Sequence, residues 1–352
     1  MHVKLAAALQ RKGHRVGVIT LAGSALRRAC EEKGIACFPL NPRFKYLDLP
    51  AALAMKRIFE HNNVQICIIG LSKDVSTVVL ATKLGSPVRL VYFQQMQFGH
   101  NKRDFFHRWS YASLERWVTL TNAMRVSVLR NTMIPDEKIR VIPFGADMSI
   151  FDPSRYKRTR SRKIFGISSR ALAIALIGRF DPQKGHEDLL LAAPKVLEEF
   201  PHSIFLFVGE ETRGEEGFRN HLQSLVESSS LQERVRFLPF TSNVPELLAA
   251  IDLVVMPSYS ESFGFLAVEA MAMGIPVVGT NTGGLSEIIQ DGVTGFLTQP
   301  GDYTQLADRI VKVLKEKKLY KAMSVNSLAR ARRHFDLEKN VSQLEAVLAE
   351  AL

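Results

Sequence analysis

The sequence has no apolar run of about 20 residues, which is the length that a helix needs to cross a membrane. Its first residues, MHVKLAAALQRKGH, contain an apolar stretch too short for a signal peptide and are typical of an amphipathic helix. Cysteine is scarce, and Cys30, Cys37 and Cys67 lie in or beside apolar segments without the spacing of metal ligands. We therefore expect a cytoplasmic protein whose thiols are buried and reduced.

Several motifs that bind metals or phosphates are also missing from the sequence. There is no Asp-x-Asp pair, no cluster of His and Cys with metal spacing, and no P-loop, G-x-G-x-x-G or G-x-S-x-G sequence. These absences predict a site without a metal ion. A diphosphate bound here would then be neutralised by Lys, by Arg and by the positive ends of helices.

The 352 residues are enough for two domains, and their charge is unevenly distributed. Residues 1–163 contain 28 Lys and Arg against 11 Asp and Glu, a net charge of +17, whereas the remainder carries −6. This asymmetry fits an anionic partner, which could be a membrane surface, nucleic acid or an acidic acceptor. An ordinary solvated basic surface fits the charge equally well.

Helical and strand-like segments alternate through residues 1–151 and again through residues 164–336. Such alternation predicts two domains, each with a parallel sheet and helices on both faces. In the first domain we expect one helix at residues 104–117. Residues 152–163, DPSRYKRTRSRK, break the pattern and predict an exposed basic linker. Nucleic-acid binding is less well supported there, because the segment has one aromatic residue, Tyr156.

One element expected of a doubly wound domain is missing from the first domain. Such a domain begins with a strand and a Gly-rich turn, and the first strand lies in the middle of the sheet. Here Met1 already belongs to a predicted helix at residues 1–12. We therefore expect that Met1 is not the natural start, and that a strand and a Gly-rich turn are encoded just upstream. The alternative is a shortened domain whose sheet closes in another way.

The most informative stretch is residues 251–274, IDLVVMPSYSESFGFLAVEAMAMG. It combines a buried strand, a Ser-rich loop and a helix at residues 263–273, so Glu261 and Glu269 should lie beyond the carboxyl end of a parallel strand. The amides of residues 263–265 suit a phosphate or a sugar oxygen, because they begin a helix. Glu269 lies in an apolar helix and needs a partner or a ligand, although either acid alone is more simply a solvated residue.

A second strand end carries two cations. Residues 174–185, IALIGRFDPQKG, place Arg179 and Lys184 beyond a buried strand and beside glycines. Arg offers a planar fork and Lys a point charge, so the two could hold a diphosphate. Each residue alone is more simply explained as surface charge. Their position beyond one strand, in register with Glu261 beyond another, favours phosphate binding.

Weaker signals lie at three other strand ends. Gly283-Gly284 allows close backbone approach before a helix, which suits an anion, and Gly209 ends a strand at residues 204–209. His100 follows a strand end in the first domain, within YFQQMQFGHNKR, and is a candidate hydrogen-bonding partner of a ligand. A structural or solvated role is the more common one for a lone histidine.

Together these motifs resemble the family 4 retaining glycosyltransferases, which have the GT-B architecture. The resemblance covers nearly the whole chain and is more specific in its second half. The motifs that carry it are Gly178-Arg179 with Lys184-Gly185, the E-x7-E pair Glu261 and Glu269 with Phe263-Gly264, Thr282-Gly283-Gly284 with Glu287, and Ile142 to Asp147 as a Pro-x-Gly-x-Asp segment.

The resemblance implies two Rossmann-like parallel-sheet domains that face a cleft, with residues 337–352 crossing back onto the first domain. It also implies roles in binding a nucleotide-sugar donor. Glu269 would hold the ribose hydroxyls, and Glu261 would contact the hydroxyls of the sugar. The backbone groups expected beside the donor belong to Phe263, Gly264, Phe265, Gly209, Gly283 and Gly284.

The implied activity is the transfer of a hexose from a UDP-sugar or GDP-sugar to an acceptor hydroxyl, with retention of the anomeric configuration. Arg179 and Lys184 would stabilise the leaving diphosphate, whose oxygen would act as the base. Glu261 and His100 would complete the catalytic group, with His100 in the place of the family's crevice histidine. The enzyme would need neither a metal nor a separate cofactor.

The expected acceptor is a glycan or a lipid-linked glycan in polysaccharide, lipopolysaccharide or glycolipid synthesis, reached by peripheral contact with the inner face of the membrane. Nucleic acid is not an expected partner. Two alternatives stay open. A nucleotide-sugar epimerase of related fold would be distinguished by product analysis with and without acceptor. A non-catalytic basic binding protein would bind anionic surfaces without turnover.

Overall fold

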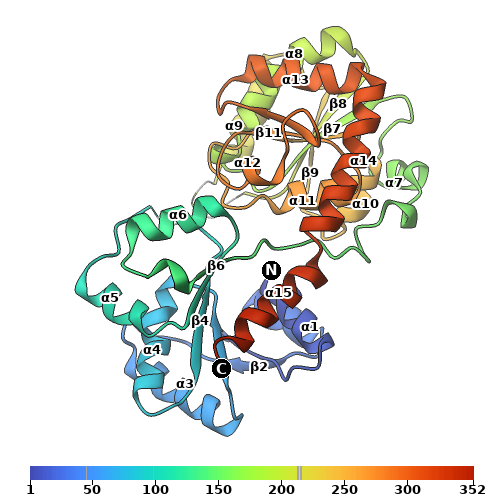
Figure 1. Cartoon of the computed structure of the whole chain (residues 1–352). Helices are drawn as coiled ribbons and strands as arrows, with labels where there is room; N and C mark the ends of the chain where they lie inside the picture. The colour runs from blue at the N-terminus through green and yellow to red at the C-terminus, as the bar shows by residue number, and fades with distance from the viewer. Residues whose placement is uncertain (45, 98, 212–213, 215) are drawn as a thin grey trace. The chain divides into compact units, whose positions relative to one another are not determined.

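A computed structural model of the chain describes residues 1–44, 46–97, 99–211, 214 and 216–352 (Figure 1). The chain divides into two compact units. Unit 1 contains Met1–Phe144 and Leu337–Leu352, and unit 2 contains Gly145–Asp336. Within the described ranges, none of the helices combines the length and the apolarity of a membrane span.

Unit 2 is built on one six-stranded parallel sheet, which confirms the predicted α/β architecture. The strands lie in the order β12-β11-β10-β7-β8-β9, so the first strand of the unit, β7, is an interior strand. Their bounds are β7 Leu172–Ile177, β8 Ser203–Val208, β9 Val235–Leu238, β10 Leu253–Met256, β11 Val277–Thr280 and β12 Gly295–Thr298. All residues of β8 and β10 are buried, as expected for a parallel sheet with helices on both faces.

The helices of unit 2 alternate with these strands and cover the sheet (Figure 1). Helix α8 packs against α13, α11 against α14, and α7 against α10. The core between helices and sheet contains the fully buried side chains of Phe180, Phe205 and Phe207. The helical bounds are η3 Pro153–Arg155, α7 Arg158–Ile164, η4 Pro182–Lys184, α8 His186–Glu199, α9 Phe218–Ser228, α10 Val244–Ala250, α11 Phe265–Ala272, α12 Leu285–Ile288, α13 Tyr303–Lys315 and α14 Lys317–His334.

Unit 1 shows the same alternation, but its strands form two separate parallel sheets. The four-stranded sheet has the order β3-β4-β5-β6, and the other sheet pairs β1 with β2. The strands are β1 Gly17–Thr20, β2 Ala36–Pro39, β3 Ile66–Ile69, β4 Arg89–Phe93, β5 Arg116–Thr119 and β6 Ile139–Val141. The helices are α1 His2–Arg11, α2 Ala25–Glu31, α3 Leu49–His61, η1 Ser72–Asp74, α4 Val75–Lys83, α5 Phe105–Ala112, α6 Asn122–Asn131, η2 Asp136–Lys138 and α15 Leu337–Ala349.

The helix expected at residues 104–117 was wrong in its second half. Helix α5 ends at Ala112, and β5 begins at Arg116 and lies between β4 and β6. Trp117 is fully buried, and its Nε1 donates a 2.9 Å hydrogen bond to Gln94 Oε1. Aromatic and β-branched residues favour a strand here, but a run this short is hard to distinguish from the end of the preceding helix.

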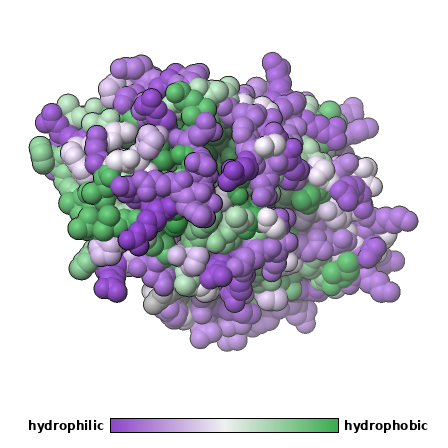
Figure 2. Space-filling view, turned by 90° about the horizontal axis from the view of Figure 1, so that it is seen from below, coloured by the Kyte–Doolittle hydropathy of each residue, from purple (hydrophilic) through white to green (hydrophobic). Residues whose placement is uncertain are grey.

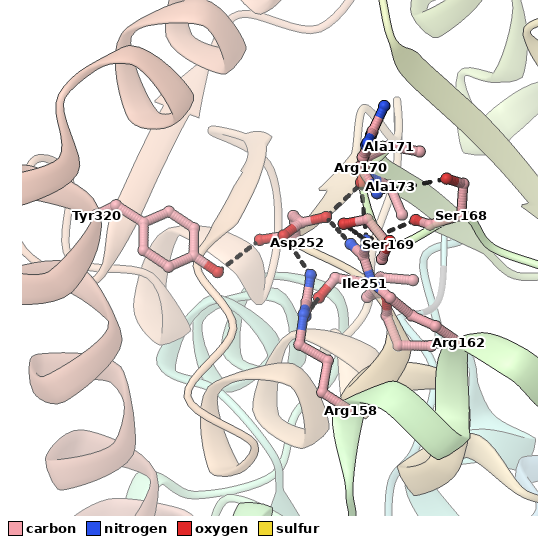
Figure 3. A network of polar contacts seen from close by, with 11 residues as sticks. Arg158, Arg162, Ser168, Ser169, Arg170, Ala171, Ala173, Ile251, Asp252 and Tyr320 are labelled. Carbon is pink, nitrogen blue, oxygen red and sulfur yellow. Dashed lines mark hydrogen bonds and ion pairs between the residues drawn. The ribbon is translucent and has the colours of Figure 1, made fainter.

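The basic segment at residues 152–163 belongs to unit 2, so the structure differs from the exposed linker that was expected. Figure 3 shows Arg158 and Arg162 of α7 directed at the carboxylate of Asp252, with Arg162 Nη2 at 2.6 Å from Asp252 Oδ2. The carbonyl oxygen of Asp252 also accepts a 2.9 Å hydrogen bond from Tyr320 Oη. These contacts give both arginines a structural role at the start of β10.

Helix α15 belongs to unit 1, where it packs against α1 (Figure 1). Glu345 of α15 lies 3.0 Å from Lys12 Nζ and 2.7 Å from His14 Nε2, at the end of α1. Glu350 lies 3.3 Å from Arg116 Nη2 at the start of β5. The resemblance placed this helix on the first domain, and unit 1 includes it.

The net charge of the chain resides in unit 1. Unit 1 contains 23 Lys and Arg against 12 Asp and Glu, whereas unit 2 contains 23 of each. The asymmetry is smaller than a division at residue 163 suggests, because the basic residues of α7 belong to unit 2. Figure 2 shows that hydrophilic residues dominate one face of the molecule, with apolar residues in scattered groups.

Candidate active site

Two loops at the carboxyl edge of the unit 2 sheet meet through a charged pair. Lys184 lies between β7 and α8, and Glu261 lies between β10 and α11, two strands that are neighbours in the sheet. Lys184 Nζ donates a 2.7 Å hydrogen bond to Glu261 Oε2, and only 23% and 15% of the two side chains are exposed. The contact confirms that the two strand ends carrying these candidates lie together.

The same two loops are joined by further contacts. The Tyr259 amide donates a 2.9 Å hydrogen bond to the Gln183 carbonyl oxygen, and Tyr259 Oη donates to Asp188 Oδ1 at 3.1 Å. Burial raises the pKa of the Asp188 carboxyl. Gly185 has a φ of 69°, and a Cβ at this position would lie 2.1 Å from the Pro257 carbonyl oxygen. Tyr259 was not predicted as a site residue, because a tyrosine in a Ser-rich loop shows no distinguishing pattern.

Helix α11 begins in the loop that carries Glu261. Its first residue is Phe265, two residues later than predicted, and Glu269 lies half-buried about one turn into the helix. Gly264 precedes the helix with a φ of 104°, a conformation that favours glycine. Phe263 is buried, with its ring centroid 5.0 Å from that of Phe265. The helix start, Glu261 and Glu269 therefore share one segment at the carboxyl edge of the sheet.

The Gly283-Gly284 turn packs against this segment. The Gly284 amide donates a 2.9 Å hydrogen bond to the Glu261 carbonyl oxygen. A Cβ at Gly283 would lie 1.9 Å from that same oxygen, and a Cβ at Gly284 would lie 2.2 Å from the Phe263 carbonyl oxygen. The two glycines thus allow the β11–α12 turn to touch the Glu261 loop. Contact between the loops explains them without an anion, and anion binding by this turn stays a prediction.

Arg179 is close to Lys184 in sequence but lies in a different environment. Its side chain is 62% exposed, and Arg179 Nη2 lies 3.6 Å from Asp181 Oδ2. Gly209, which follows β8, approaches the same turn, since a Cβ there would lie 1.9 Å from the Gly178 carbonyl oxygen. The β7–α8 loop therefore offers one exposed cation and one mostly buried cation that is already paired.

His186, which was not predicted from the sequence, lies beneath this loop as the first residue of α8. It is fully buried, and its ring centroid lies 5.4 Å from those of both Phe180 and Phe207. Burial lowers the pKa of His186 to about 4, so that its ring is neutral at pH 7. The neutral ring packs among aromatic side chains and so anchors the adjoining Lys184-Gly185 turn to the core of unit 2.

The remaining candidate, His100, lies in unit 1. It is exposed in the loop that follows β4. Phe98, in the same predicted segment, lies outside the described residues. The other candidate catalytic residues belong to unit 2, and the role of His100 stays a prediction.

The described side chains of unit 2 at this edge of the sheet can bind a ligand through hydrogen bonds and ion pairs. Cations, carboxylates and the start of α11 converge at one edge of the sheet, and such groups bind phosphate and sugar hydroxyls. Across the ranges that the structure describes, no group of three or more His, Cys, Asp and Glu could hold a metal ion.

Two family models match the chain. The model described as "Glycosyl transferases group 1" matches residues 157–330, and the model described as "Glycosyltransferase Family 4" matches residues 3–150. The N-acetyl-alpha-D-glucosaminyl L-malate synthase of Bacillus anthracis is 34% identical over 67% of this chain and 60% of its own length. The D-inositol 3-phosphate glycosyltransferase of Corynebacterium efficiens is 31% identical over 61% of this chain and 51% of its own. The chain thus spans about half the length of the curated relatives that it matches.

Solved structures resemble the chain over almost its whole length. A glycosyltransferase from Rickettsia africae has a TM-score of 0.90 at 23% identity, covering 99% of this chain and 93% of that one. HepE of Anabaena, in complex with UDP and glucose, has a TM-score of 0.82 at 25% identity, covering 99% and 96%. These likenesses show the overall fold.

Proposed function

Because the chain belongs to glycosyltransferase family 4 and has the GT-B fold, we propose that it transfers a sugar from a nucleotide diphosphate-sugar to an acceptor hydroxyl. The chain matches only part of its curated relatives, so the activity rests on the site in unit 2 as much as on kinship. The observation that carries the proposal is the 2.7 Å pair of Lys184 and Glu261 at the carboxyl edge of the sheet.

The pair can bind both parts of the donor. A lysine ammonium has three hydrogen-bond donors, and with one engaged by Glu261, two are left for oxygens of a diphosphate. Glu261 in turn accepts hydrogen bonds from the hydroxyls of the sugar. Arg179 supplies a second, exposed cation to the diphosphate, whose negative charge grows as the glycosidic bond breaks.

The nucleotide is proposed to lie along the start of α11. Glu269, about one turn into this helix, would accept hydrogen bonds from the ribose hydroxyls. The positive end of the helix dipole and the amides near Phe265 favour a phosphate at the same place. The complexes of HepE with UDP and with UDP-glucose support a uridine diphosphate donor as the first to test.

We infer that the reaction retains the anomeric configuration, uses a hexose donor and requires no metal ion. The side chains described above include two cations suited to neutralising the leaving group, Arg179 and Lys184. Retention would follow if the acceptor attacks from the face that the diphosphate leaves, with a diphosphate oxygen taking the acceptor proton.

The acceptor is proposed to be an anionic or lipid-linked glycan of a polysaccharide, lipopolysaccharide or glycolipid. The support is the charge of unit 1, which has 23 Lys and Arg against 12 Asp and Glu. Such a surface attracts anionic acceptors and the inner face of a membrane alike. Two relatives are named for the anionic compounds L-malate and D-inositol 3-phosphate.

The experiment is a thermal-shift screen of the full chain with UDP, GDP and their sugars, followed by product analysis. A ligand that binds only the folded state raises the unfolding temperature, and the donor that does so is then incubated with candidate acceptors, with and without EDTA. We expect an α-linked product from an α-linked donor, formed equally in EDTA. If no nucleotide or nucleotide-sugar raises the unfolding temperature, the proposed donor site is refuted. Epimerised donor without acceptor would favour an epimerase.

A further inference from the structure

Tyr259 contacts the loops that follow four consecutive strands of the unit 2 sheet, beginning with its own loop after β10. Its amide donates a 2.9 Å hydrogen bond to the Gln183 carbonyl oxygen, in the loop after β7. Its carbonyl oxygen accepts a 3.3 Å hydrogen bond from Thr282 Oγ1, in the turn after β11. Gly301, which follows β12, is also in contact, since a Cβ there would lie 3.4 Å from Tyr259 Oη. Tyr259 thus joins the loops after β12, β11, β10 and β7.

The hydroxyl group of Tyr259 binds a buried carboxylate on α8. Tyr259 Oη donates a 3.1 Å hydrogen bond to Asp188 Oδ1, and Asp188 is only 6% exposed. The other carboxyl oxygen, Oδ2, is buried and has no hydrogen-bond partner among the residues that the structure describes. Burial raises the pKa of the Asp188 carboxyl, and the hydrogen bond from Tyr259 opposes this rise. Removing the hydroxyl group would leave the carboxylate without its tyrosine donor, which is unfavourable for a buried polar group.

The hydrogen bonds of Tyr259 lie next to the proposed donor-binding pair. Tyr259 is two residues before Glu261 in the loop after β10. Gln183, whose carbonyl oxygen accepts from the Tyr259 amide, directly precedes Lys184. Asp188 lies in the first turn of α8, the helix that begins two residues after Lys184. The amide and the hydroxyl group of Tyr259 therefore hold together the two segments of backbone that carry the pair.

We propose that Tyr259 and Asp188 are positioning residues for the transfer reaction. They hold the Lys184–Glu261 pair in the geometry that the donor requires, and neither of them needs to touch the donor. The inference rests on the proposed function, in which Lys184 binds the diphosphate and Glu261 binds the sugar. A displacement of about 1 Å between such groups can slow a reaction on the order of 100-fold. Because the bridge joins both loops, its loss should displace the two proposed ligands relative to one another.

The first test compares the kinetics of Tyr259→Phe with those of Tyr320→Phe. The second variant is a matched control that also loses one tyrosine hydroxyl, because Tyr320 Oη donates a 2.9 Å hydrogen bond to the Asp252 carbonyl oxygen at the other end of β10. We expect Tyr259→Phe to lower kcat on the order of 10-fold while the Kd of the nucleotide changes less than about threefold, since the ligands are kept but misplaced. Tyr320→Phe should keep the wild-type kcat.

The second test measures hydrogen exchange of the full chain and does not depend on turnover. It follows the amide of residue 259, which donates to Gln183, and the Gly284 amide, which donates to the Glu261 carbonyl oxygen. Both amides should exchange roughly 10-fold faster in Tyr259→Phe and in Asp188→Leu, while the amides of β7 and β8 keep their wild-type rates. Asp188→Asn should retain wild-type exchange and most of the wild-type kcat, because its amide oxygen can accept the same hydrogen bond.

Three results would overturn the proposal. The first is a wild-type kcat, or wild-type exchange of the two amides, in Tyr259→Phe. The second is faster exchange throughout unit 2, which would show that the hydroxyl group only stabilises the fold. The third is an equal defect in Asp188→Asn and Asp188→Leu, because the accepted hydrogen bond would then not be what matters. A wild-type chain that transfers no sugar would instead contradict the proposed function, and the amide exchange then decides separately whether Tyr259 holds the loops.

Discussion

Lys184 Nζ and Glu261 Oε2 lie 2.7 Å apart, although the two residues are separated by 77 positions in the chain. They meet because β7 and β10 are neighbours, so the loops that follow these parallel strands open at the same edge of the sheet. The proposed sugar-binding carboxylate and the proposed phosphate-binding cation therefore hold one another in place. A change in either residue should affect both parts of the donor.

Replacing both proposed phosphate ligands should slow the reaction. The double variant Arg179→Ala, Lys184→Ala is expected to lower the transfer rate roughly 100-fold or more, because neither cation then neutralises the leaving diphosphate. The rate is measured with saturating donor and acceptor. The control is Lys195→Ala, since Lys195 is an exposed cation that pairs with Asp308 and is not one of the proposed phosphate ligands. Full activity of the double variant would remove the diphosphate assignment.

The two acidic residues should produce different kinetic defects. Glu269→Ala is expected to raise the KM of the donor and the Kd of its nucleotide, because the ribose loses its partner. Glu261→Ala is expected to lower kcat with a smaller effect on the Kd of the nucleotide alone, because it contacts the sugar. Calorimetry with the nucleotide and steady-state kinetics separate the two effects. Identical defects in both variants would contradict the assigned roles.

Substitution of Gly284 should disturb the loop that carries Glu261. The φ of Gly284 is −69°, which alanine readily adopts, but its Cβ would lie 2.2 Å from the Phe263 carbonyl oxygen. We expect Gly284→Ala to destabilise unit 2 by about 1–3 kcal/mol, measured on the urea transition that nucleotide shifts. Gly178→Ala is the control, because no atom lies within 4 Å of a Cβ there. Equal stability of the two variants would show that the loops are not in contact.

Burial of His186 should make unit 2 less stable in acid. The pKa of His186 is lowered to about 4 from its ordinary value of 6.5. Between these pH values the unfolded chain binds a proton that the folded chain does not, so the free energy of unfolding falls as the pH decreases from 6.5 to about 4. Across this pH range the contribution of His186 to the free energy of unfolding changes by roughly 3 kcal/mol. Above pH 6.5 and below about pH 4 this contribution no longer changes with pH.

Urea unfolding of His186→Leu at several pH values checks this expectation. The variant should lose the His186 contribution to the pH dependence, while His202→Leu should keep it, since His202 is exposed and lies outside the aromatic core around His186. A wild-type slope in His186→Leu would assign the pH dependence to other groups.

The basic charge of unit 1 should bind anionic vesicles weakly and reversibly. Each Lys or Arg near such a surface contributes about 1 kcal/mol, and salt screens the attraction. In co-sedimentation, Arg28→Glu with Lys33→Glu in unit 1 should weaken binding more than Lys317→Glu with Lys318→Glu in unit 2, although the change in charge is the same. Binding that persists at high salt, or equal losses in both variants, would exclude an electrostatic contact through unit 1.

The neighbourhood of the two loops could be predicted, because parallel strands place their carboxyl ends at one edge. Hydrophobic periodicity located β7 and β10 and so placed Lys184 and Glu261 beyond their ends, whereas the roles of the two residues stay a prediction. Contacts between the residues of different loops could not be predicted from hydrophobic periodicity. The packing of Gly284 against Phe263 depends on how closely two loops approach, which no local pattern encodes.

The basic helix α7 was not predicted, because the residues that recur on one face of it are charged and not apolar. Arg158 and Arg162 are four residues apart and therefore lie on one face of the helix, but apolar residues do not mark that face. Their partner Asp252 is about 90 residues away, and nothing in the local sequence indicates the pairing. Long-range ion pairs of this kind become visible only when the strand order is known.

The contacts of Asp252 also show that the two ends of β10 have different roles. Asp252 fixes the amino end of β10 to α7 and α14, whereas the loop with Glu261 leaves its carboxyl end. Loop grafting should exploit this division. We expect that residues between Met256 and Phe265 can be exchanged for those of a related enzyme without loosening the amino end of β10, as long as the contacts with Gln183 and Gly284 are kept.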